Sequence, residues 1–398
     1  MSNLYPKQGT LAVLRTAWIV TAIFILSNAA TPLYLQWQQN LGFQSGVLGL
    51  VFACYIVGLL LTLTVAGQLS DCFGRKALLI PCVGLAMVAA ALFYCADSVA
   101  MLMLARFLTG ISVGLVVSGG MANIVDHAEP HRKHFASLIA STAMVAGAGT
   151  GPLLAGAIAQ YAGAPIHKVF SIEIGLLLLA MLAVLNQPNH RSGGRGFRLR
   201  MPAVPKSSVG VVLTGIAFFG PGLTSTSFVL SLGPKLMSSF LHANSPVVTG
   251  GMAFCMFLVA VAVQLLAAKI SAPKVFVLSG GSTFFAMMSL WVALDLASAP
   301  WLFLAAMLAG AGQGLGQLGG LTLIADNVPS ERRAEANAVF NMGGYVPAGA
   351  IPVITGYLID LTGLQSGVTT LTVMIASLAV LALISLRREV LHDVQRGI

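Results

Sequence analysis

Arg106 is the side chain whose position points most directly to chemistry, because it lies inside an otherwise apolar run, 99–124. A guanidinium stays ionised at any accessible pH, and placing it in lipid costs at least about 2.5–3.5 kcal/mol unless it has a cavity or a partner. Its charge can hold a nearby carboxylate ionised or attract an anionic group. Near a helix end, it can instead extend to the water interface. We interpret Arg106 as a candidate coupling residue, ahead of this structural alternative.

A second set of reactive side chains lies in the polar stretch 67–76, Gly-Gln-Leu-Ser-Asp-Cys-Phe-Gly-Arg-Lys, which separates two long apolar runs. Its two glycines allow the chain to reverse direction sharply. Arg75 and Lys76 would lie just outside a bilayer, where cations mark the cytoplasmic face. Asp71 is close enough to the turn to pair with a cation from a neighbouring loop or helix end. The stretch is predicted to be a charged turn between two membrane helices.

A cluster of acidic and imidazole side chains follows the fourth apolar run and raises the question of a metal site. Pro130 interrupts any helix between two of its histidines. Clustered side chains alone do not set a coordination geometry, and a cytoplasmic loop is an ordinary place for such charges. We therefore predict no bound metal and no cofactor. The members of the cluster are Asp126, His127, Glu129, His131 and His134.

The composition is that of a membrane protein. Of the 398 residues, 57% are hydrophobic and only 8% are charged, and the mean hydropathy is +0.89. A soluble domain has about 25% charged residues, so this chain cannot cover a water-exposed surface. A membrane span needs about 20 mostly apolar residues, and lipid offers no partner to open backbone groups, so each such run is predicted to be a helix. The twelve runs are 14–37, 46–66, 77–95, 99–124, 135–160, 168–187, 208–232, 247–268, 275–294, 300–324, 337–358 and 367–386.

The Lys and Arg residues are distributed unequally between the two sides of this topology. The chain carries 21 of them against 12 acidic residues, a net charge of +9. If both termini are cytoplasmic, nearly all of these cations face the cytoplasm, and only Lys168, Lys235 and the intramembrane Arg106 do not. This positive-inside pattern predicts cytoplasmic termini, and it explains the net positive charge without a nucleic-acid partner. We expect a multi-pass protein of the bacterial inner membrane, in contact with the lipid bilayer.

Two smaller expectations concern the outer face. Trp37, Trp291 and Trp301 lie near predicted outer helix ends and are interpreted as interfacial anchors. Glu173 lies about one turn inside the sixth run, close in sequence to Lys168. These two side chains are expected to pair at the outer interface.

The twelve runs fall into two halves that repeat at a spacing of 200 residues. The basic, Gly/Pro-rich segment 188–206 is predicted to be a cytoplasmic linker between two six-helix bundles, 1–187 and 207–398. Arg106 corresponds to Ala306, so any chemistry is concentrated in the first half. Parallel six-helix repeats are typical of transporters whose substrate site lies between the halves. The recurring residues are Ala105, Leu108, Gly110, Gly114, Leu115, Gly119, Gly120, Ile124 and Asp126, which return as Ala305, Leu308, Gly310, Gly314, Leu315, Gly319, Gly320, Ile324 and Asp326.

Small residues recur in the fifth run at Gly147, Gly151 and Gly156, with Pro152 between the last two. Glycines at this spacing let helices approach closely, and the proline removes a backbone hydrogen bond and bends the helix. The structural alternative is that these residues serve helix packing only. Packing is expected to be part of their role under either interpretation.

Three of these patterns together resemble signatures of the major facilitator superfamily. The stretch 67–76 resembles the family's loop between the second and third helices, and Leu102-x-x-x-Arg106-x-x-x-Gly110 is similar to its fourth-helix motif. The fifth-run pattern is similar to that of its drug/proton antiporters. The sequence departs from these patterns at Cys72, Thr109 and Ala155, where the family usually has Arg, Gln and Gly. The resemblance implies an all-α integral membrane fold of twelve transmembrane helices in two six-helix bundles. It also implies a gating loop that comprises Gly67, Asp71, Gly74, Arg75 and Lys76.

The resemblance further implies a secondary active transporter that works by alternating access and is not an enzyme. Because the fifth-helix pattern accompanies export within the superfamily, proton-coupled efflux of a small molecule is the leading hypothesis. No acid lies deep in any core span, and a buried cation without a counter-charge is costly, so the cargo is predicted to be neutral or anionic. An importer or facilitator for a sugar or organic acid is the alternative. The candidates for lining the substrate cavity are Asn28, Thr31, Tyr34, Gln313, Gln317, Asn341 and Tyr345.

Other functional classes have less support. The sequence has no H-E-x-x-H or G-x-S-x-G motif and no paired intramembrane carboxylates, as a membrane enzyme would need. It has no G-x-x-x-x-G-K-[ST] loop, so ATP is not the implied energy source. A membrane receptor or structural protein stays open, and substrate flux in proteoliposomes under an imposed pH gradient would distinguish it from a transporter.

Overall fold

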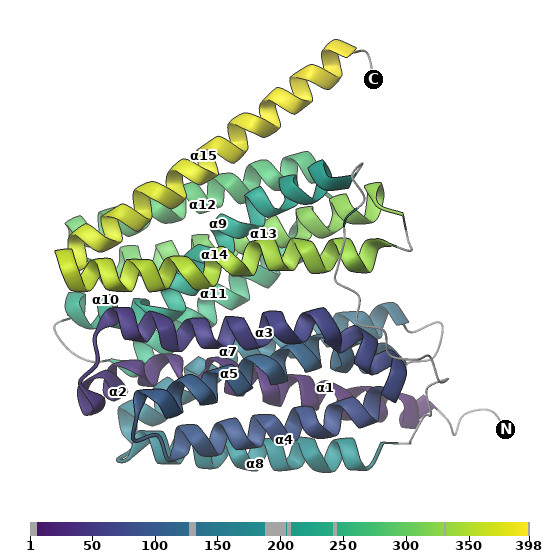
Figure 1. Ribbon diagram of the computed structural model, residues 1–398, viewed down its shortest axis with the longest axis vertical. Helices are drawn as coiled ribbons and strands as arrows, with labels where there is room; N and C mark the ends of the chain where they lie inside the picture. The colour runs from purple at the N-terminus through teal and green to yellow at the C-terminus, as the bar shows by residue number, and fades with distance from the viewer. Residues whose placement is uncertain are drawn as a thin grey trace. The chain divides into compact units, whose positions relative to one another are not determined.

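The computed structural model describes residues 6–126, 133–187, 204, 208–241, 245–329 and 332–396, and these residues form helices with no strand among them (Figure 1). In chain order the helices are α1 (Pro6–Ala29), the 3₁₀ turn η1 (Thr31–Leu33), α2 (Tyr34–Leu41), α3 (Ser45–Phe73), α4 (Arg75–Tyr94), α5 (Val99–Leu115), the π-helical η2 (Val116–Gly120), α6 (Met121–Asp126), α7 (Lys133–Tyr161), α8 (Pro165–Leu185), α9 (Val209–Ser231), α10 (Gly233–Leu241), α11 (Pro246–Ala267), α12 (Ala272–Asp295), α13 (Ala299–Asn327), α14 (Arg333–Thr362) and α15 (Leu364–Arg396).

Twelve segments of the described chain are long and apolar enough to cross a membrane, which confirms the predicted spans. The first of them, Val13–Leu41, is not one continuous helix as the apolar run suggested. It breaks after Ala29 and resumes at Tyr34, because Pro32 has no backbone N–H to continue the hydrogen-bond ladder. This break leaves backbone carbonyls at the end of α1 without helical partners.

The chain divides into two compact units. Unit 1 comprises Met1–Gly42, Cys54–Met201 and Pro246–Gly251, and unit 2 comprises Phe43–Ala53, Pro202–Ser245 and Met252–Ile398. The start of α3 thus groups with unit 2, and the start of α11 groups with unit 1. The division into 1–187 and 207–398 stays a prediction, and nearly all of the linker 188–206 lies outside the described residues.

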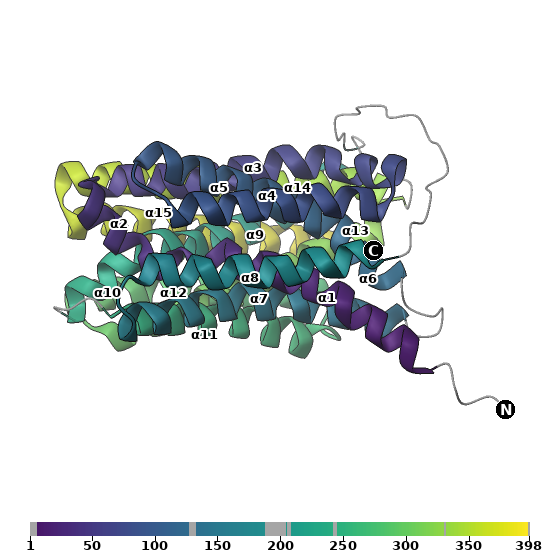
Figure 2. The ribbon, with the colours of Figure 1, turned by 90° about the horizontal axis from the view of Figure 1, so that it is seen from below.

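In unit 1, α1 forms the centre of the bundle. It packs mainly against α7 and α8 and also contacts α5 and α4. After Arg15 it is mostly apolar around its circumference, as is expected of a helix at the core of a bundle, and α4 in turn packs against both α5 and α8. α8 lies at the periphery, nearest the viewer in Figure 2, and buries one face only. The fully buried residues of α1 include Ile19, Val20, Ala22, Ile23 and Leu26.

Unit 2 repeats this arrangement. α9 packs against α13 and α14 as α1 packs against α5 and α7, and α12 packs against α13 and α15 as α4 packs against α5 and α8. The corresponding helices begin about 200 residues apart. Twelve membrane-spanning segments among the described residues, in two bundles of the same internal topology, confirm the predicted fold class and its repeat.

Gly110 and Gly310 show why the repeat keeps glycine in one register. A Cβ atom at Gly110 would meet the backbone of Tyr55 on α3, and a Cβ at Gly310 would meet the backbone of Met256 on α11. These helix pairs can approach so closely only because the residue has no side chain. The repeated glycines therefore mark close helix contacts within each unit.

The polar stretch 67–76 is mostly helix, which corrects the prediction of a turn. α3 continues through Phe73, and α4 begins at Arg75. The whole reversal is made at Gly74, whose φ of 89° lies in a region that favours glycine, while its N–H donates to the Ser70 carbonyl at 3.0 Å. One glycine is enough for the turn, so Gly67 remains inside the helix.

Candidate functional site

Arg106 and Glu173 are the only charged side chains that are buried among the residues that the structure describes, with 1% and 4% of their surfaces exposed. Both belong to unit 1, Arg106 on α5 and Glu173 on α8. Charged side chains in a membrane interior are costly and usually functional. These two residues therefore define the candidate site.

The break in the first span gives Arg106 a partner. Arg106 Nη1 donates to the Ser27 carbonyl oxygen at 2.6 Å, and this carbonyl lies in the last turn of α1, where helical N–H partners run out. Its Cζ lies 5.0 Å from the centre of the Tyr34 ring and 5.7 Å from that of Phe93. Its Nε and Nη2 have no hydrogen-bond partner. The guanidinium is thus held inside unit 1 with donors to spare, and it does not extend to the surface.

Four aromatic rings form a cluster beside Arg106. Trp37 lies 6.3 Å from Tyr34, 5.7 Å from Phe93 and 6.0 Å from Phe170, measured between ring centres, and Phe93 stacks on Phe170 at 4.9 Å. Trp37 is only 1% exposed, so it is a core residue of unit 1 and not the interfacial anchor that we predicted. The helix break at Ala30–Leu33 explains the error. The prediction assumed one straight helix, in which Trp37 would lie at the membrane interface.

Glu173 lies one helical turn after Phe170 on α8 and faces the interior of unit 1. Its Oε2 has no hydrogen-bond partner, whereas Lys168 is exposed, so the expected pairing of these two side chains is wrong. The sequence contained a signal for this burial. Val169, Phe170, Glu173 and Leu177 form one stripe at helical spacing, and every member of it is buried.

Arg106 and Glu173 lie at similar depth in unit 1. At a rise of about 1.5 Å per residue, Arg106 is about 10 Å along α5 from Val99, and Glu173 is about 12 Å along α8 from Pro165. Both helices begin at the same end of unit 1, because Phe93, in the last turn of α4, contacts Arg106 as well as Phe170. The aromatic cluster therefore lies beside both charged groups.

Buried polar atoms without partners gather in this part of unit 1. Buried polar groups in native proteins are nearly always hydrogen-bonded, so a group of unpaired ones calls for an explanation such as a bound solute, a proton or water. An anion or a hydrogen-bond acceptor can bind the free guanidinium N–H groups, and the aromatic faces suit a flat apolar body. The unpaired atoms are Thr31 Oγ1, Tyr34 OH, Trp37 Nε1, Arg106 Nε and Nη2, and Glu173 Oε2.

The predicted gating residues lie at the opposite end of α4. Arg75 Nε forms an ion pair of 3.2 Å with Asp126 Oδ2, and Arg75 Nη1 also bonds Ser70 Oγ. Lys76 Nζ donates to the carbonyls of Leu185 and Gln187, both at 2.7 Å. The two cations thus bind partners within unit 1. The side chains of Asp71 and Gln68, and any contacts of Gly67, lie outside the described residues.

A polar network that the sequence did not suggest fixes the end of α8. Asn123 Nδ2 donates to Gln187 Oε1 at 3.0 Å, and Gln187 Nε2 donates to Thr16 Oγ1 at 3.3 Å. Together with Lys76 it ties α1, α4 and α6 to the residues after α8. Of the acidic and imidazole cluster, Asp126 bonds Arg75, while His127, Glu129, His131 and the His134 side chain lie outside the described residues.

The fifth-helix glycines face neighbouring helices closely. A Cβ at Gly147 or Gly151 would meet the α1 backbone at Thr21 or Ile25, and one at Gly156 would meet the backbone of Pro246. Pro152 lies inside α7. Helix packing therefore accounts for the position of all three glycines.

The cavity candidates are split between the units. Tyr34 is buried beside Arg106 in unit 1, Thr31 is buried at the start of η1, and Asn28 donates to Ser27 Oγ at 2.9 Å. The four cavity candidates that belong to unit 2 are half-buried. Gln317 Oε1 accepts from Gln264 at 3.4 Å, Asn341 donates to the Asn337 carbonyl at 2.8 Å, Tyr345 lies edge-on to Phe219, and Gln313 follows Gly312 on α13.

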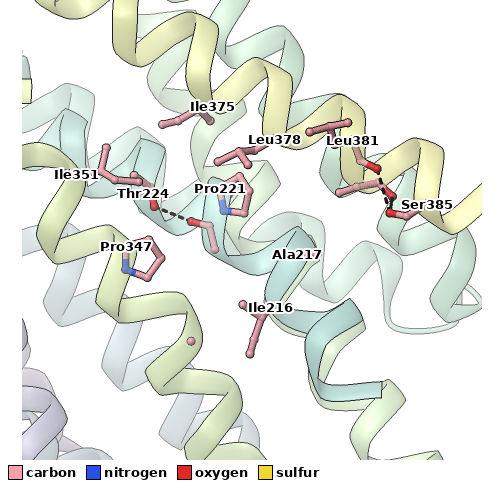
Figure 3. Close-up of a pocket in the computed structure, with 13 residues that line it drawn as sticks. Ile216, Ala217, Pro221, Thr224, Pro347, Ile351, Ile375, Leu378, Leu381 and Ser385 are labelled. Carbon is pink, nitrogen blue, oxygen red and sulfur yellow. Dashed lines mark hydrogen bonds between the residues drawn. The ribbon is translucent and has the colours of Figure 1, made fainter. Parts of the chain in front are cut away.

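A cavity of about 330 Å³ lies between α9, α14 and α15 in unit 2 (Figure 3). Ile216, Pro221 and Pro347 are among its mostly apolar lining residues. Its two hydroxyls are already bonded, Thr224 Oγ1 to the Gly220 carbonyl at 2.8 Å and Ser385 Oγ to the Leu381 carbonyl at 2.9 Å. The cavity therefore offers little to orient a polar solute and suits a hydrocarbon chain.

Comparison with known proteins supports a transporter. The profile of the Major Facilitator Superfamily matches residues 17–272 and, in a second match, residues 208–396. The quinolone resistance protein NorA of Staphylococcus aureus (strain Mu50 / ATCC 700699) is 26% identical over 247 residues, which is 59% of this chain. The chain spans 62% of the length of that relative.

Solved structures show the same fold at low identity. An auto-inhibited peptide transporter of the POT family superposes with a TM-score of 0.75 at 12% identity, covering 94% of this chain and 96% of its own. A D-xylose–proton symporter superposes with a TM-score of 0.73 at 15% identity, covering 95% of this chain and 96% of its own. At such identities the likeness concerns the fold alone.

Proposed function

Because the chain belongs to the Major Facilitator Superfamily, we propose that it is a secondary transporter that exports a small neutral or anionic molecule in exchange for protons. The observation that carries the proposal is the pair of buried charged residues, Arg106 and Glu173, beside one aromatic cluster in unit 1. A transporter needs such groups to bind its cargo and its coupling ion in the membrane interior.

Glu173 is the residue that we assign to the coupling proton. A carboxyl group can lose or gain a proton, whereas the guanidinium of Arg106 stays charged and can carry none. An ionised carboxylate buried without a partner costs several kcal/mol, so a change of its charge must be accompanied by a change of its contacts. That link between protonation and conformation is what proton coupling requires.

Arg106 is assigned to the cargo and to charge balance. Its two unpaired nitrogens can donate to an acceptor or an anionic group of the substrate, with Tyr34 and Phe93 packed on the guanidinium. Glu173 is the only acid buried among the described residues, and we assign it to the coupling proton. No second buried acid is then left among these residues to neutralise a cationic cargo. This charge balance favours a neutral or anionic molecule.

The direction of transport rests on the relatives. NorA is named for quinolone resistance, and a membrane carrier confers resistance when it lowers the internal concentration of a drug. The fifth-helix pattern Gly147–Gly156 resembles that of exporters, but helix packing already accounts for the positions of its glycines, so it adds little to this assignment. The likeness to a D-xylose–proton symporter shows a shared fold and leaves import of a metabolite as the second candidate.

Orientation and gating complete the proposal. We infer cytoplasmic termini in a bacterial inner membrane from the distribution of Lys and Arg. Gly67, Asp71, Gly74, Arg75 and Lys76 then lie at the cytoplasmic side and act as a gating loop. The ion pair between Arg75 and Asp126 supports this assignment, because it fixes the loop to the end of α6.

Transport by the purified protein in proteoliposomes tests the proposal. The vesicles contain one labelled compound of a panel of neutral, anionic and cationic molecules that includes a quinolone, and a pH gradient of either sign is imposed. We expect saturable flux of a neutral or anionic compound in the direction opposite to the flow of protons. This flux should stop when an ionophore collapses the pH gradient. Flux in the same direction as protons would indicate symport, and flux that ignores the gradient would indicate facilitation.

A further inference from the structure

A second cavity of unit 2, of about 720 Å³, lies between the start of α12 and the last membrane-spanning turns of α15. We call it the α12–α15 groove. Its walls are apolar, and two cations lie at its edge. Its lining residues include Lys274, Val277, Leu278, Leu383, Leu386 and Arg387.

The groove opens because α12 and α15 are pinned together at one point and diverge beyond it. A Cβ atom at Gly280 would meet the Leu383 side chain, so the two helices are in close contact there. Beyond this point α15 turns away from α12 toward its C-terminal end (Figure 1). The groove is the space between the two helices on the Lys274 side of Gly280.

The floor of the groove is fixed by the core of unit 2. Leu386 is buried in a cluster with Phe218 and Phe276, and Leu383 packs against the same cluster. The two phenylalanine rings stack at 4.8 Å. Val277 and Leu278 are about half exposed and form a wall of α12. This preformed, open hydrocarbon surface is not covered by any of the described residues of unit 2.

Lys274 and Arg387 stand where a lipid headgroup would lie. Lys274 is in the first turn of α12, and Arg387 is the last residue of its membrane span. Both side chains are exposed, and neither has an ion pair or hydrogen bond within the described part of the chain. Two exposed cations at a span end therefore lie directly beside an apolar groove.

We propose that the α12–α15 groove binds an anionic phospholipid. Its phosphate pairs with Lys274 and Arg387, and one acyl chain lies along Val277 and Leu278 over the Leu383–Leu386 floor. Basic pockets between membrane helices are suited to anionic headgroups, and arginine can bind a phosphate through two parallel N–H bonds. The proposal does not depend on the transported molecule or on proton coupling.

The cavity of Figure 3 provides an internal comparison. It also borders α15 and is also apolar, yet its lining residues include no cation. It can accept a hydrocarbon chain of any lipid but cannot distinguish one headgroup from another. Selectivity for an anionic lipid is therefore expected from the α12–α15 groove alone.

Native mass spectrometry of the full-length protein tests the proposal with one lipid at a time. The delipidated protein in detergent is titrated with phosphatidylglycerol, with phosphatidylcholine of the same chains, or with inorganic phosphate. The test variant is Lys274→Gln with Arg387→Gln. The charge-matched control is Arg15→Gln with Lys168→Gln, two exposed cations of unit 1. A third variant, Leu278→Trp, fills the apolar part of the groove and leaves the charges in place.

We expect the wild type and the control to bind one phosphatidylglycerol more tightly than phosphatidylcholine. Each cation near an anionic group contributes about fivefold to binding, so the test variant should lose about 25-fold in affinity for phosphatidylglycerol. Leu278→Trp should weaken the binding of phosphatidylglycerol, but this lipid should still bind more tightly than phosphatidylcholine. Equal loss in the control, an unchanged test variant, or an inorganic phosphate affinity equal to that of the lipid would each overturn the proposal.

Discussion

Asp360, near the end of α14, caps the first residue of α3, Ser45. Its Oδ1 accepts the Ser45 N–H at 3.0 Å and its Oδ2 accepts the Gly46 N–H at 2.6 Å, while Lys235 Nζ bonds Ser45 Oγ. A carboxylate at a helix N-terminus satisfies donors that have no helical partner and interacts favourably with the helix dipole. The residue 200 positions earlier is Gln160, so the repeat has a carboxyl side chain at this position in its second half only.

Removing this cap should weaken the fold. Losing an N-terminal cap costs about 0.5–2 kcal/mol of stability, so Asp360→Ala should lower the thermal unfolding midpoint in detergent, and Asp360→Asn should lower it less because an amide oxygen still accepts. Asp295→Ala, which removes an exposed acid of the same unit, is the control and should leave the midpoint unchanged. Equal midpoints for all three variants would show that the cap contributes nothing.

Arg106→Ala should abolish proton-driven transport, and Arg106→Lys should keep part of it. The alanine variant loses the bond to the Ser27 carbonyl and the charge over Tyr34 and Phe93. A hydrogen bond to a charged group is worth about 1.5–3 kcal/mol, which is about a ten- to hundredfold effect. Lysine keeps the charge but lacks the planar fork. Near-normal flux in both variants would mean that Arg106 is only structural.

Glu173→Gln should uncouple transport from protons. Glutamine keeps the size and hydrogen-bonding capacity of the side chain but cannot exchange a proton. We expect it to lose the flux driven by a pH gradient while keeping substrate exchange between equal proton concentrations. Asp97→Asn, at an exposed acid of the same unit, is the matched control. If Glu173→Gln still responds to the pH gradient, another group carries the proton. If neither the variant nor the wild type responds, proton coupling itself is wrong.

The charge of the cargo provides a fourth prediction. Among the described residues no acid besides Glu173 is buried, and a cation in the membrane interior needs a counter-charge. Cells that produce the protein should therefore expel a permanently cationic dye no faster than cells that lack it. Saturable export of such a dye, lost on deletion of the gene, would contradict the assignment of Arg106 to a neutral or anionic cargo.

The gating loop can be tested separately from stability. The Arg75–Asp126 pair is exposed, with 31% and 55% of the two side chains accessible, and such pairs contribute about 0–1 kcal/mol. Asp126→Asn should therefore leave the unfolding midpoint nearly unchanged. If the loop gates transport, this variant and Asp71→Asn should both slow flux at normal expression. Wild-type flux in both would remove the gating role.

Most of the fold could be predicted because lipid leaves few options. Apolar runs of about 20 residues must be helices there, so the twelve spans and their repeat follow from composition and spacing alone. The extent of α3 through Phe73 could not be predicted in this way. Polar residues beyond the bilayer can continue a helix as readily as end it, and only Gly74 has the backbone conformation of a turn.

The site was predicted in part. Arg106 stood out because a cation inside an apolar run is rare and costly. Glu173 was misplaced because its distance from the helix start was counted and the face on which it lies was not. Trp37 was misplaced because Pro32 breaks the first span, and a hydropathy pattern does not show where a chain goes after a break. The partners of Arg106 depend on that same break.

The repeat has a consequence for how the two halves respond to substitution. Its positions corresponding to Arg106 and Glu173 hold Ala306 and Val373, so the duplicated halves share helix packing and differ in charge. The buried charged residues thus occur in one half of the described chain, whereas the close glycine contacts occur in both. A side chain added at Gly110 or at Gly310 is therefore expected to disturb its own half to a similar degree, while the loss of a buried charge is expected to disturb unit 1 alone.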